Sequence, residues 1–446
     1  MPSEAVILTP HRANPLRPKV FQGFNRKSFV ASPSEAMRGI GADQFVELSS
    51  EVLKKIDSKQ FNELSNDVFA GFDKKHIKAL PVEVMDTFDE NKLGMLPSVA
   101  MGGFTHKSFA ALPAEAMRGL GADQFVELSS EVLKKIDSKQ FNELSNDVFA
   151  GFDKKHIKAL PVEVMDTFDE NKLGMLPSVA MGGFTHKSFA ALPAEAMRGL
   201  GADQFVELSS EVLKKIDSKQ FNELSNDVFA GFDKKHIKAL PVEVMDTFDE
   251  NKLGMLPSVA MGGFNRKNFA ALPAEAMRGL GADQLNQIVP DLFEVISPLQ
   301  VEALQPTAID GMTSKQLKKL SPDAFEIFDK DILTNFKYSW ANGVTVGQLR
   351  TLDRKERKLL PGDFLKGLSK PQLKILKIKP KSLTGLMHSH QFDHLHGNDS
   401  TATPLMHEHD YSHSHISYGT GDHKHSSDYN LSNISYEPIH NDGTHP

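Results

Sequence analysis

The chain contains no cysteine, so neither disulfide bonds nor thiolate chemistry can contribute to its stability or activity. It also has no apolar run long enough to form a membrane-spanning helix. The first twenty residues have a four-residue apolar core followed by two arginines, which does not fit a secretory signal peptide. A lack of cysteine suits an extracellular protein but also many cytosolic proteins, so a cytoplasmic location stays open.

The chain also lacks a basic surface stripe over most of its length. The net charge of −7 is concentrated after residue 387, where eight acidic residues accompany one lysine, and the rest of the chain is balanced. Broad binding of nucleic acid needs clustered positive charge. We therefore expect no nucleic-acid partner and no transmembrane segment.

What the sequence does contain is a repeat. Blocks of eighty residues with nearly identical sequences begin at Gly41, Gly121 and Gly201, and the sequence diverges from Leu285 onward. Each block divides into lines of sixteen residues, and each line into two octads with apolar residues at positions five and eight. Such periods indicate units that stack on their neighbours along the chain.

The octad pattern predicts short helices. Apolar residues at positions five and eight, often with another at four, follow the spacing of one helix face. Position one is usually a helix-start residue, and Asp57 and Thr313 are each followed by glutamine at the capping-box position. The dipeptide Leu-Pro, as at Leu80-Pro81, recurs along the chain. Because the residue before a proline disfavours helical geometry, helices should end there after about six to eight residues. A period of sixteen residues also permits a β-solenoid, but Glu, Lys, Ala, Met and Leu at helical spacing favour helices.

We therefore predict an all-α solenoid of very short helices with 16 residues, or two octads, per coil. The first octad of a line is polar at position four and should face solvent, whereas the second is apolar there and should be more deeply buried. Aspartates at line starts, such as Asp57, Asp73 and Asp89, should be N-caps rather than calcium ligands. Five histidines of the first octads should lie on the solvent face: His76, His106, His156, His186 and His236.

Changes in composition divide the chain into four regions. We expect residues 1–16 to form a flexible arm, residues 17–336 the octad-repeat solenoid, and residues 337–387 degenerate basic capping repeats. Residues 388–446 form an acidic, histidine-rich tail that should be disordered or conditionally ordered. The basic segment 345–381 suggests an anionic surface partner; a solvated cap, or a docking site for the acidic tail of another copy, would explain it as well.

The tail contains two copies of the pattern H-x-H-x-x-x-H-x-H and a further H-x-H pair. In an extended chain, residues two apart point to the same side, so each pair can offer two imidazoles to zinc, nickel or copper. The alternative is a polar tail whose charge changes with pH. The spacing misses the H-x-H-x-D-H pattern of metallo-β-lactamase-type hydrolases, so we expect no hydrolase site in the tail. The candidate metal ligands are His388, His390, His394, His396, His407, His409, His413, His415, His423 and His425.

The segments TSKQLKKL (Thr313–Leu320) and DSKQFNEL (Asp57–Leu64) resemble the T-x-x-Q-h-x-x-L helical repeats of large bacterial secreted and surface proteins. The resemblance covers about residues 17–376. It implies a short-helix solenoid with a structural or adhesive role, no catalytic residues and no enzyme activity. We therefore expect an extracellular or cell-surface protein that acts as a rigid spacer or as a self-associating fibre subunit. The alternative is a metal-binding or adhesion scaffold that uses the tail.

Overall fold

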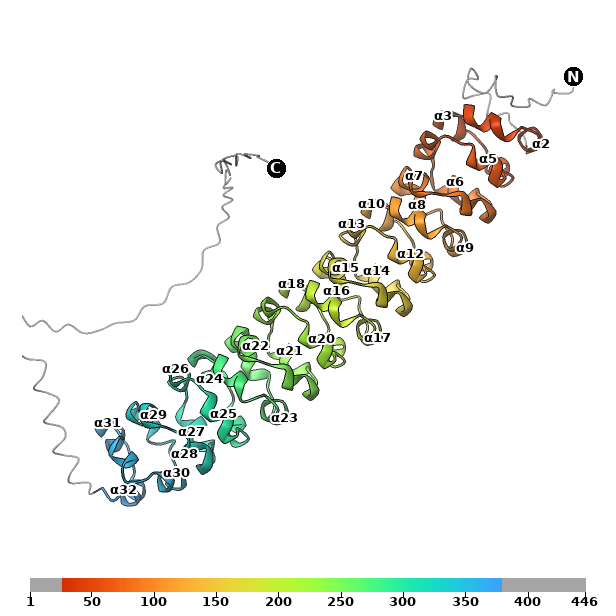
Figure 1. Ribbon diagram of the computed structural model, residues 1–446. Helices are drawn as coiled ribbons and strands as arrows, with labels where there is room; N and C mark the ends of the chain where they lie inside the picture. The colour runs from red at the N-terminus through yellow and green to blue at the C-terminus, as the bar shows by residue number, and fades with distance from the viewer. Residues whose placement is uncertain (1–25, 379–446) are drawn as a thin grey trace, which may run out of the picture. The chain divides into compact units, whose positions relative to one another are not determined.

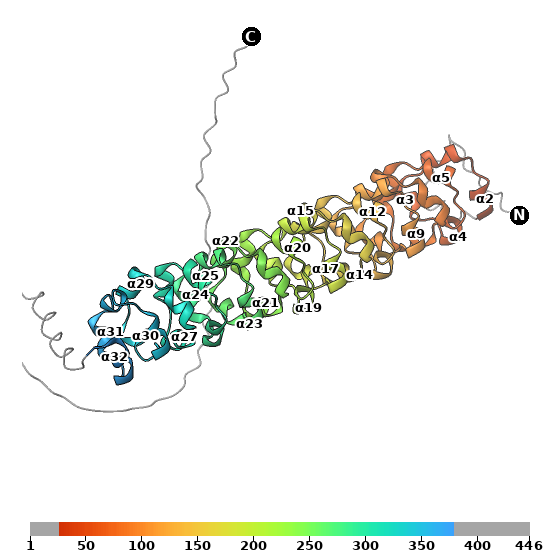
Figure 2. The same ribbon diagram turned by 60° about the horizontal axis from the view of Figure 1, so that its bottom comes forward.

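The structure is a computed structural model, and it describes residues 26–378. This range contains short helices and no strand. In both views the helices follow one another in chain order from α2 (Arg26–Val30) to α32 (Lys370–Leu376) (Figures 1 and 2). The predicted all-α fold of regularly repeated short helices is confirmed.

The bounds of the elements show the octad period. The α-helices between α2 and α32 are α3 (Ala42–Phe45), α4 (Ser50–Leu53), α5 (Ser58–Asn62), α6 (Lys74–Ala79), α7 (Glu90–Gly94), α8 (Ser98–Met101), α9 (His106–Ala110), α10 (Ala122–Phe125), α11 (Ser130–Leu133), α12 (Ser138–Asn142), α13 (Asn146–Phe149), α14 (Lys154–Ala159), α15 (Glu170–Gly174), α16 (Ser178–Met181), α17 (His186–Ala190), α18 (Ala202–Phe205), α19 (Ser210–Leu213), α20 (Ser218–Asn222), α21 (Lys234–Ala239), α22 (Glu250–Met255), α23 (Arg266–Ala270), α24 (Ala282–Gln287), α25 (Pro298–Ala303), α26 (Pro306–Ile309), α27 (Ser314–Lys319), α28 (Pro322–Glu326), α29 (Lys330–Thr334), α30 (Val346–Thr351) and α31 (Gly362–Lys366). The 3₁₀ helices are η1 (Ser34–Gly39), η2 (Asn66–Gly71), η3 (Val82–Thr87), η4 (Ala114–Gly119), η5 (Val162–Thr167), η6 (Ala194–Gly199), η7 (Asn226–Gly231), η8 (Val242–Thr247), η9 (Ser258–Gly263), η10 (Glu275–Gly279), η11 (Pro290–Glu294), η12 (Tyr338–Trp340) and η13 (Glu356–Lys358).

Local capping explains where the first-octad helices begin. The carboxylate of Asp57 accepts a hydrogen bond from the backbone N–H of Gln60 at 2.8 Å, and the Gln60 amide oxygen accepts one from the N–H of Asp57 at 3.4 Å. Thr313 and Gln316 form the same box in α27. Asp73 and Asp89 are N-caps as predicted. The helix ends are also as predicted, because Leu80, which precedes Pro81, has extended backbone angles.

Many second-octad helices wind more tightly than an α-helix. Their N-caps, such as Ser65 in front of η2 and Pro81 in front of η3, make no side-chain capping bond. A segment of six residues leaves most α-helical end groups unpaired, whereas i→i+3 bonding pairs more of them. The helices of both kinds span between three and seven residues, somewhat shorter than the sequence predicts.

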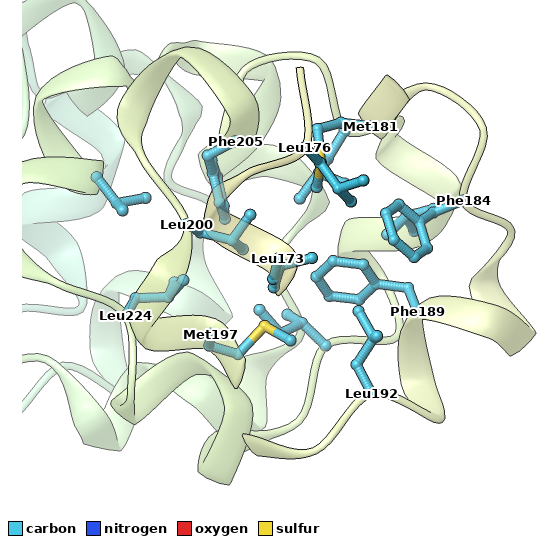
Figure 3. Packing of buried hydrophobic residues seen from close by; sticks show 14 of the residues in the cluster. Leu173, Leu176, Met181, Phe184, Phe189, Leu192, Met197, Leu200, Phe205 and Leu224 are labelled. Atoms are coloured by element: carbon cyan, nitrogen blue, oxygen red, sulfur yellow. The ribbon is translucent and has the colours of Figure 1, made fainter. Parts of the chain in front are cut away.

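Residues at positions five and eight form one core cluster that extends from Phe29 to Leu376. Figure 3 shows part of this cluster, where Phe189 of α17 and Met197 of η6 point into the same core and the ring of Phe184 lies 5.8 Å from that of Phe189 between centroids. The phenylalanines make repeated ring contacts, such as the stacked pair Phe205–Phe232 at 4.4 Å between centroids. The phenylalanines and methionines at positions five and eight are core residues, whereas Met95, Met175 and Met255, at position seven, are 40–41% exposed.

The predicted two octads per coil is wrong, because neighbours in space are further apart in the sequence. Helix α5 packs against η1 and η3, which are the third elements before and after it. Hydrogen bonds between coils join residues 25 to 31 positions apart, which is between three and four octads. Two such short helices per coil would leave part of each apolar stripe in water, whereas three to four surround a shared core.

Candidate functional site

The ten predicted metal ligands, from His388 to His425, lie outside the described residues, so metal binding by the tail stays a prediction. Within residues 26–378, no group of three or more His, Asp or Glu side chains is arranged to hold a metal ion. Besides surface ion pairs between coils, the described residues form two groups of polar side chains: a buried series inside the coils and a basic cleft at the C-terminal end.

The buried series, here the position-four ladder, consists of the polar residues at position four of the first octads. The amide oxygen of Gln124 accepts a hydrogen bond from the N–H of Gly121 at 2.8 Å. Its amide nitrogen donates to the carbonyl oxygens of Leu93 at 3.0 Å and Leu96 at 2.7 Å. One side chain thus caps its own helix and pairs carbonyls of a helix four octads earlier.

The ladder corrects the expectation that first octads face solvent at position four. Gln60, Gln140 and Gln220 are only 2–3% exposed. Burying an amide is favourable only when its donors and acceptors are paired, and the carbonyls of the neighbouring coil pair its N–H groups. The sequence signal was glutamine at the third helical position, which we interpreted only as half of a capping box.

Three of the five repeat histidines belong to the ladder. His76 Nδ1 lies 3.0 Å from the N–H of Asp73, and Nε2 lies 3.3 Å from the carbonyl oxygen of Val46 in the preceding coil. The rings of Phe45 and Phe72 lie beside the imidazole. Solvent exposure was therefore a wrong prediction for this residue and its two equivalents, His156 and His236, whereas His106 and His186 are exposed as predicted.

The surroundings of Asp73, the N-cap beside His76, lower the pKa of its carboxyl group. Partial burial raises its pKa, but hydrogen bonds from the N–H groups of His76 and Lys75 and the nearby positive charges outweigh burial, so the pKa lies below the usual value. The same shift occurs at Asp153 and Asp233. These carboxylates are ionised helix caps rather than proton donors at neutral pH.

Lys92 occupies the ladder position of the next first octad and is only 5% exposed. Its ammonium group donates to Asn62 Oδ1 at 2.8 Å and to the carbonyl oxygen of Thr87 at 2.7 Å. Burial lowers the pKa of Lys92, and the charge of Asp89 offsets part of that effect. Because Asn62 lies in the preceding coil, the ammonium group joins α7 to α5, while the carbonyl oxygen of Thr87 binds it from within its own coil.

The basic cleft lies at the C-terminal end of the described chain and has a volume of about 680 Å³. Its apolar lining comes from Leu360, Leu365, Leu376 and Ile378. Its charged lining comes from Arg354, Arg357, Lys358 and Lys377. An apolar floor with a cationic rim suits an anionic group on an apolar body. The expected anionic partner of segment 345–381 stays a prediction.

The end of α32 shapes this cleft. Lys377 has φ 60° and ψ 32°, a left-handed conformation typical of the residue that ends a helix. The N–H of Ile378 donates to the carbonyl oxygen of Leu373 at 3.0 Å, which turns the chain back so that Ile378 packs on the core. Arg357 is held by the carbonyl oxygen of Leu352 at 2.9 Å.

Of the helices between residues 26 and 378, none is both long and apolar enough to cross a membrane. No protein-family model matches the chain, and its sequence has no significant match among curated proteins.

Proposed function

We propose that this chain is a non-enzymatic structural protein of the cell surface or extracellular space, which acts as a spacer or as the subunit of a self-assembling fibre. The buried glutamines and lysines of the position-four ladder donate hydrogen bonds to the neighbouring coil, the glutamines to backbone carbonyls and the lysines to asparagine side chains, so they serve cohesion. The resemblance to the octapeptide repeats of bacterial surface proteins supports the same role.

The observation that carries the proposal is that each block rebuilds the same connections between coils. The bond from the ammonium group to asparagine is 2.8 Å long at Lys92, Lys172 and Lys252. The core runs through all the blocks without interruption. A chain of this kind can change its length by whole blocks without any new type of contact.

Block deletion tests this proposal. Removal of residues 121–200 joins Leu120 to Gly201 and recreates a junction that the chain already contains. We expect this variant to keep its helical circular dichroism and a similar melting temperature. In electron micrographs its particles should be shorter than those of the full chain by the contribution of one block.

The matched control removes a single octad, residues 121–128. After the junction, first octads then occupy the places of second octads relative to the preceding coils, and second octads occupy those of first octads. Apolar position-four residues then face carbonyls that need a donor, so we expect a lower melting temperature and protease cleavage near the junction. Equal stability of the two deletions, or dispersed globular particles for the full chain, would contradict the proposal.

A further inference from the structure

The eighty residues after the third block, from residue 281, have lost a set of contacts that the earlier blocks share. A groove of about 850 Å³ opens there between η10, α25 and the segment from α28 to α29. We call it the diverged groove. The lining residues used below are Glu275, Arg278, Leu299, Glu302, Ile327 and Ile332.

The blocks themselves show what has changed. At the equivalent place in the third block, Lys252 donates to Asn222 at 2.8 Å, which joins two coils. Ile332 and Glu302 stand eighty residues later at these two positions, so this bond cannot form.

A second connection is lost at the same place. Arg198 of the second block donates to Glu223 of the third block at 2.7 Å, and Arg118 makes the same pair with Glu143. Arg278 is retained, but the residue in the place of the glutamate is Ala303. Both side-chain connections across this face are therefore missing, and the face is open.

Other replacements at this face are apolar. Lys219, Phe221 and Thr247 of the third block correspond to Leu299, Val301 and Ile327. Leu299 is 65% exposed, the highest value among the exposed large hydrophobic residues. Valine in place of phenylalanine reduces side-chain volume, and leucine in place of lysine puts an apolar side chain in water. Val301 itself is buried, so the apolar surface that a covering molecule would remove from water belongs to Leu299 and the partly buried Ile327.

The charge of the groove indicates what covers it. Its lining has four carboxylates, those of Glu275, Glu302, Glu326 and Asp329, against the single cation of Arg278. The equivalent face eighty residues earlier also has four carboxylates but has three cations. The groove thus combines an apolar floor with an excess of negative charge, which selects a segment with both apolar and cationic side chains.

The chain itself contains such a segment at its N-terminus. Residues 1–24, here called the N-terminal arm, combine the expected flexible arm (1–16) with the first eight residues of the predicted solenoid, and they carry Arg12, Arg17 and Lys19 against the single acidic residue Glu4. The same stretch has two apolar groups, at residues 6–8 and 20–21. We propose that the diverged groove of one copy binds this N-terminal arm of a second copy and so joins copies head to tail. This inference names a partner for the proposed structural role and rests on it, but the two are tested by different variants.

Complementation between two variants of the full chain tests the joint. The groove variant Glu302→Asn/Ala303→Glu/Ile332→Lys restores the residues of the third block, so it should fold. The arm variant Arg12→Glu/Arg17→Glu/Lys19→Glu reverses the charge of the arm. In sedimentation velocity runs over a concentration series, the natural chain should form a ladder of oligomers, and each variant alone should associate at least about tenfold more weakly.

The mixture of the two variants decides the mechanism. It contains one intact arm and one intact groove, so it should form dimers and no longer oligomers. The control is Asp166→Lys/Asp246→Lys, which changes charge at the positions equivalent to Glu326 in the second and third blocks. This control should associate like the natural chain.

Three results would overturn the inference. A natural chain that is monomeric at all concentrations would show that the arm binds its own chain or nothing. A mixture that fails to dimerise would show that arm and groove are not partners. Association weakened equally by the control would reveal a general charge effect. None of these results would affect the block-deletion test.

Discussion

Glycine at the end of η4 is required by a close contact between coils. A Cβ atom on Gly119 would lie 1.9 Å from the carbonyl oxygen of Glu90, and no flexible side chain could move aside to relieve the clash. The equivalents Gly199 and Gly279 face the same contact with Glu170 and Glu250. The backbones of α7 and η4 therefore approach so closely at Gly119 that only glycine fits there.

We predict that Gly119→Ala destabilises the second half of the first block. Separation of α7 from η4 should cost about 1–3 kcal/mol, as overpacking in other cores does. Urea denaturation followed by circular dichroism measures the loss. The control is Gly121→Ala, because a Cβ atom there would lie 3.8 Å from the nearest atom, the amide oxygen of Gln124. Equal effects of the two substitutions would refute the close-contact argument.

The position-four ladder gives a second prediction at the level of single residues. Gln124→Leu would remove the donor to the carbonyl oxygens of Leu93 and Leu96 and should cost about 1–3 kcal/mol. Gln124→His should be tolerated better, since His76 caps its own helix and faces a carbonyl of the earlier coil from the same octad position. Thermal melts of both variants check the order. A leucine variant as stable as the histidine variant would mean that the ladder contributes no stability.

Residues whose partners are close in the sequence could be predicted, and residues whose partners are distant could not. The caps Asp57 and Thr313 were predicted because each one bonds a residue three positions away. The second half of the same interaction, from Gln60 to Phe29, spans 31 residues. No local pattern contains that distance, so His76 and its equivalents were wrongly placed in solvent.

At the scale of helices, the coils are held by packing supplemented by buried bonds from one helix to another. Helix α7 reaches α5 through the ammonium group of Lys92, and two later blocks repeat this connection through Lys172 and Lys252. Burial penalises the charged form of each lysine, so the connection depends on pH.

We predict that stability rises as the pH increases toward 10.5. Burial lowers the pKa of Lys92, Lys172 and Lys252 in the folded chain below 10.5, so between the folded and unfolded pKa values the unfolded chain binds more protons. Stability must then increase with pH in that window. The variant with methionine at all three positions should lack this increase when melting temperatures are compared between pH 8 and pH 10. Parallel pH profiles of the two proteins would contradict the assignment.

The sequence predicted the helices but not how many make a coil. The octad period, the position-five and position-eight core residues and the proline corners are all local features, and each is present in the structure. The number of octads per coil depends on how neighbouring helices pack, as between α5, η1 and η3. The sequence repeats every sixteen residues because first and second octads alternate. The coil has a different period, three to four octads, because that period is set by packing between helices.

At the scale of the whole described chain, each element makes its main contacts with the third element before and after it. Stability in such an arrangement is a sum over neighbouring coils, and unfolding need not be a single transition. This is why the substitutions above should act within their own block. It also explains how the face around Ile332 could change while the remaining blocks stayed the same.

Metal binding by the histidine-rich tail is the prediction that separates the spacer from the alternative metal-binding scaffold. A chain ending at Met387 keeps every described residue and loses all ten candidate ligands. In calorimetric titrations with zinc, nickel and copper, we expect the full chain to bind and the shortened chain to release no comparable heat. Binding should weaken as the pH falls below about 6.5, because imidazole must be neutral to coordinate a metal. Equal heats from the two chains would place any metal site elsewhere and leave the tail without this role.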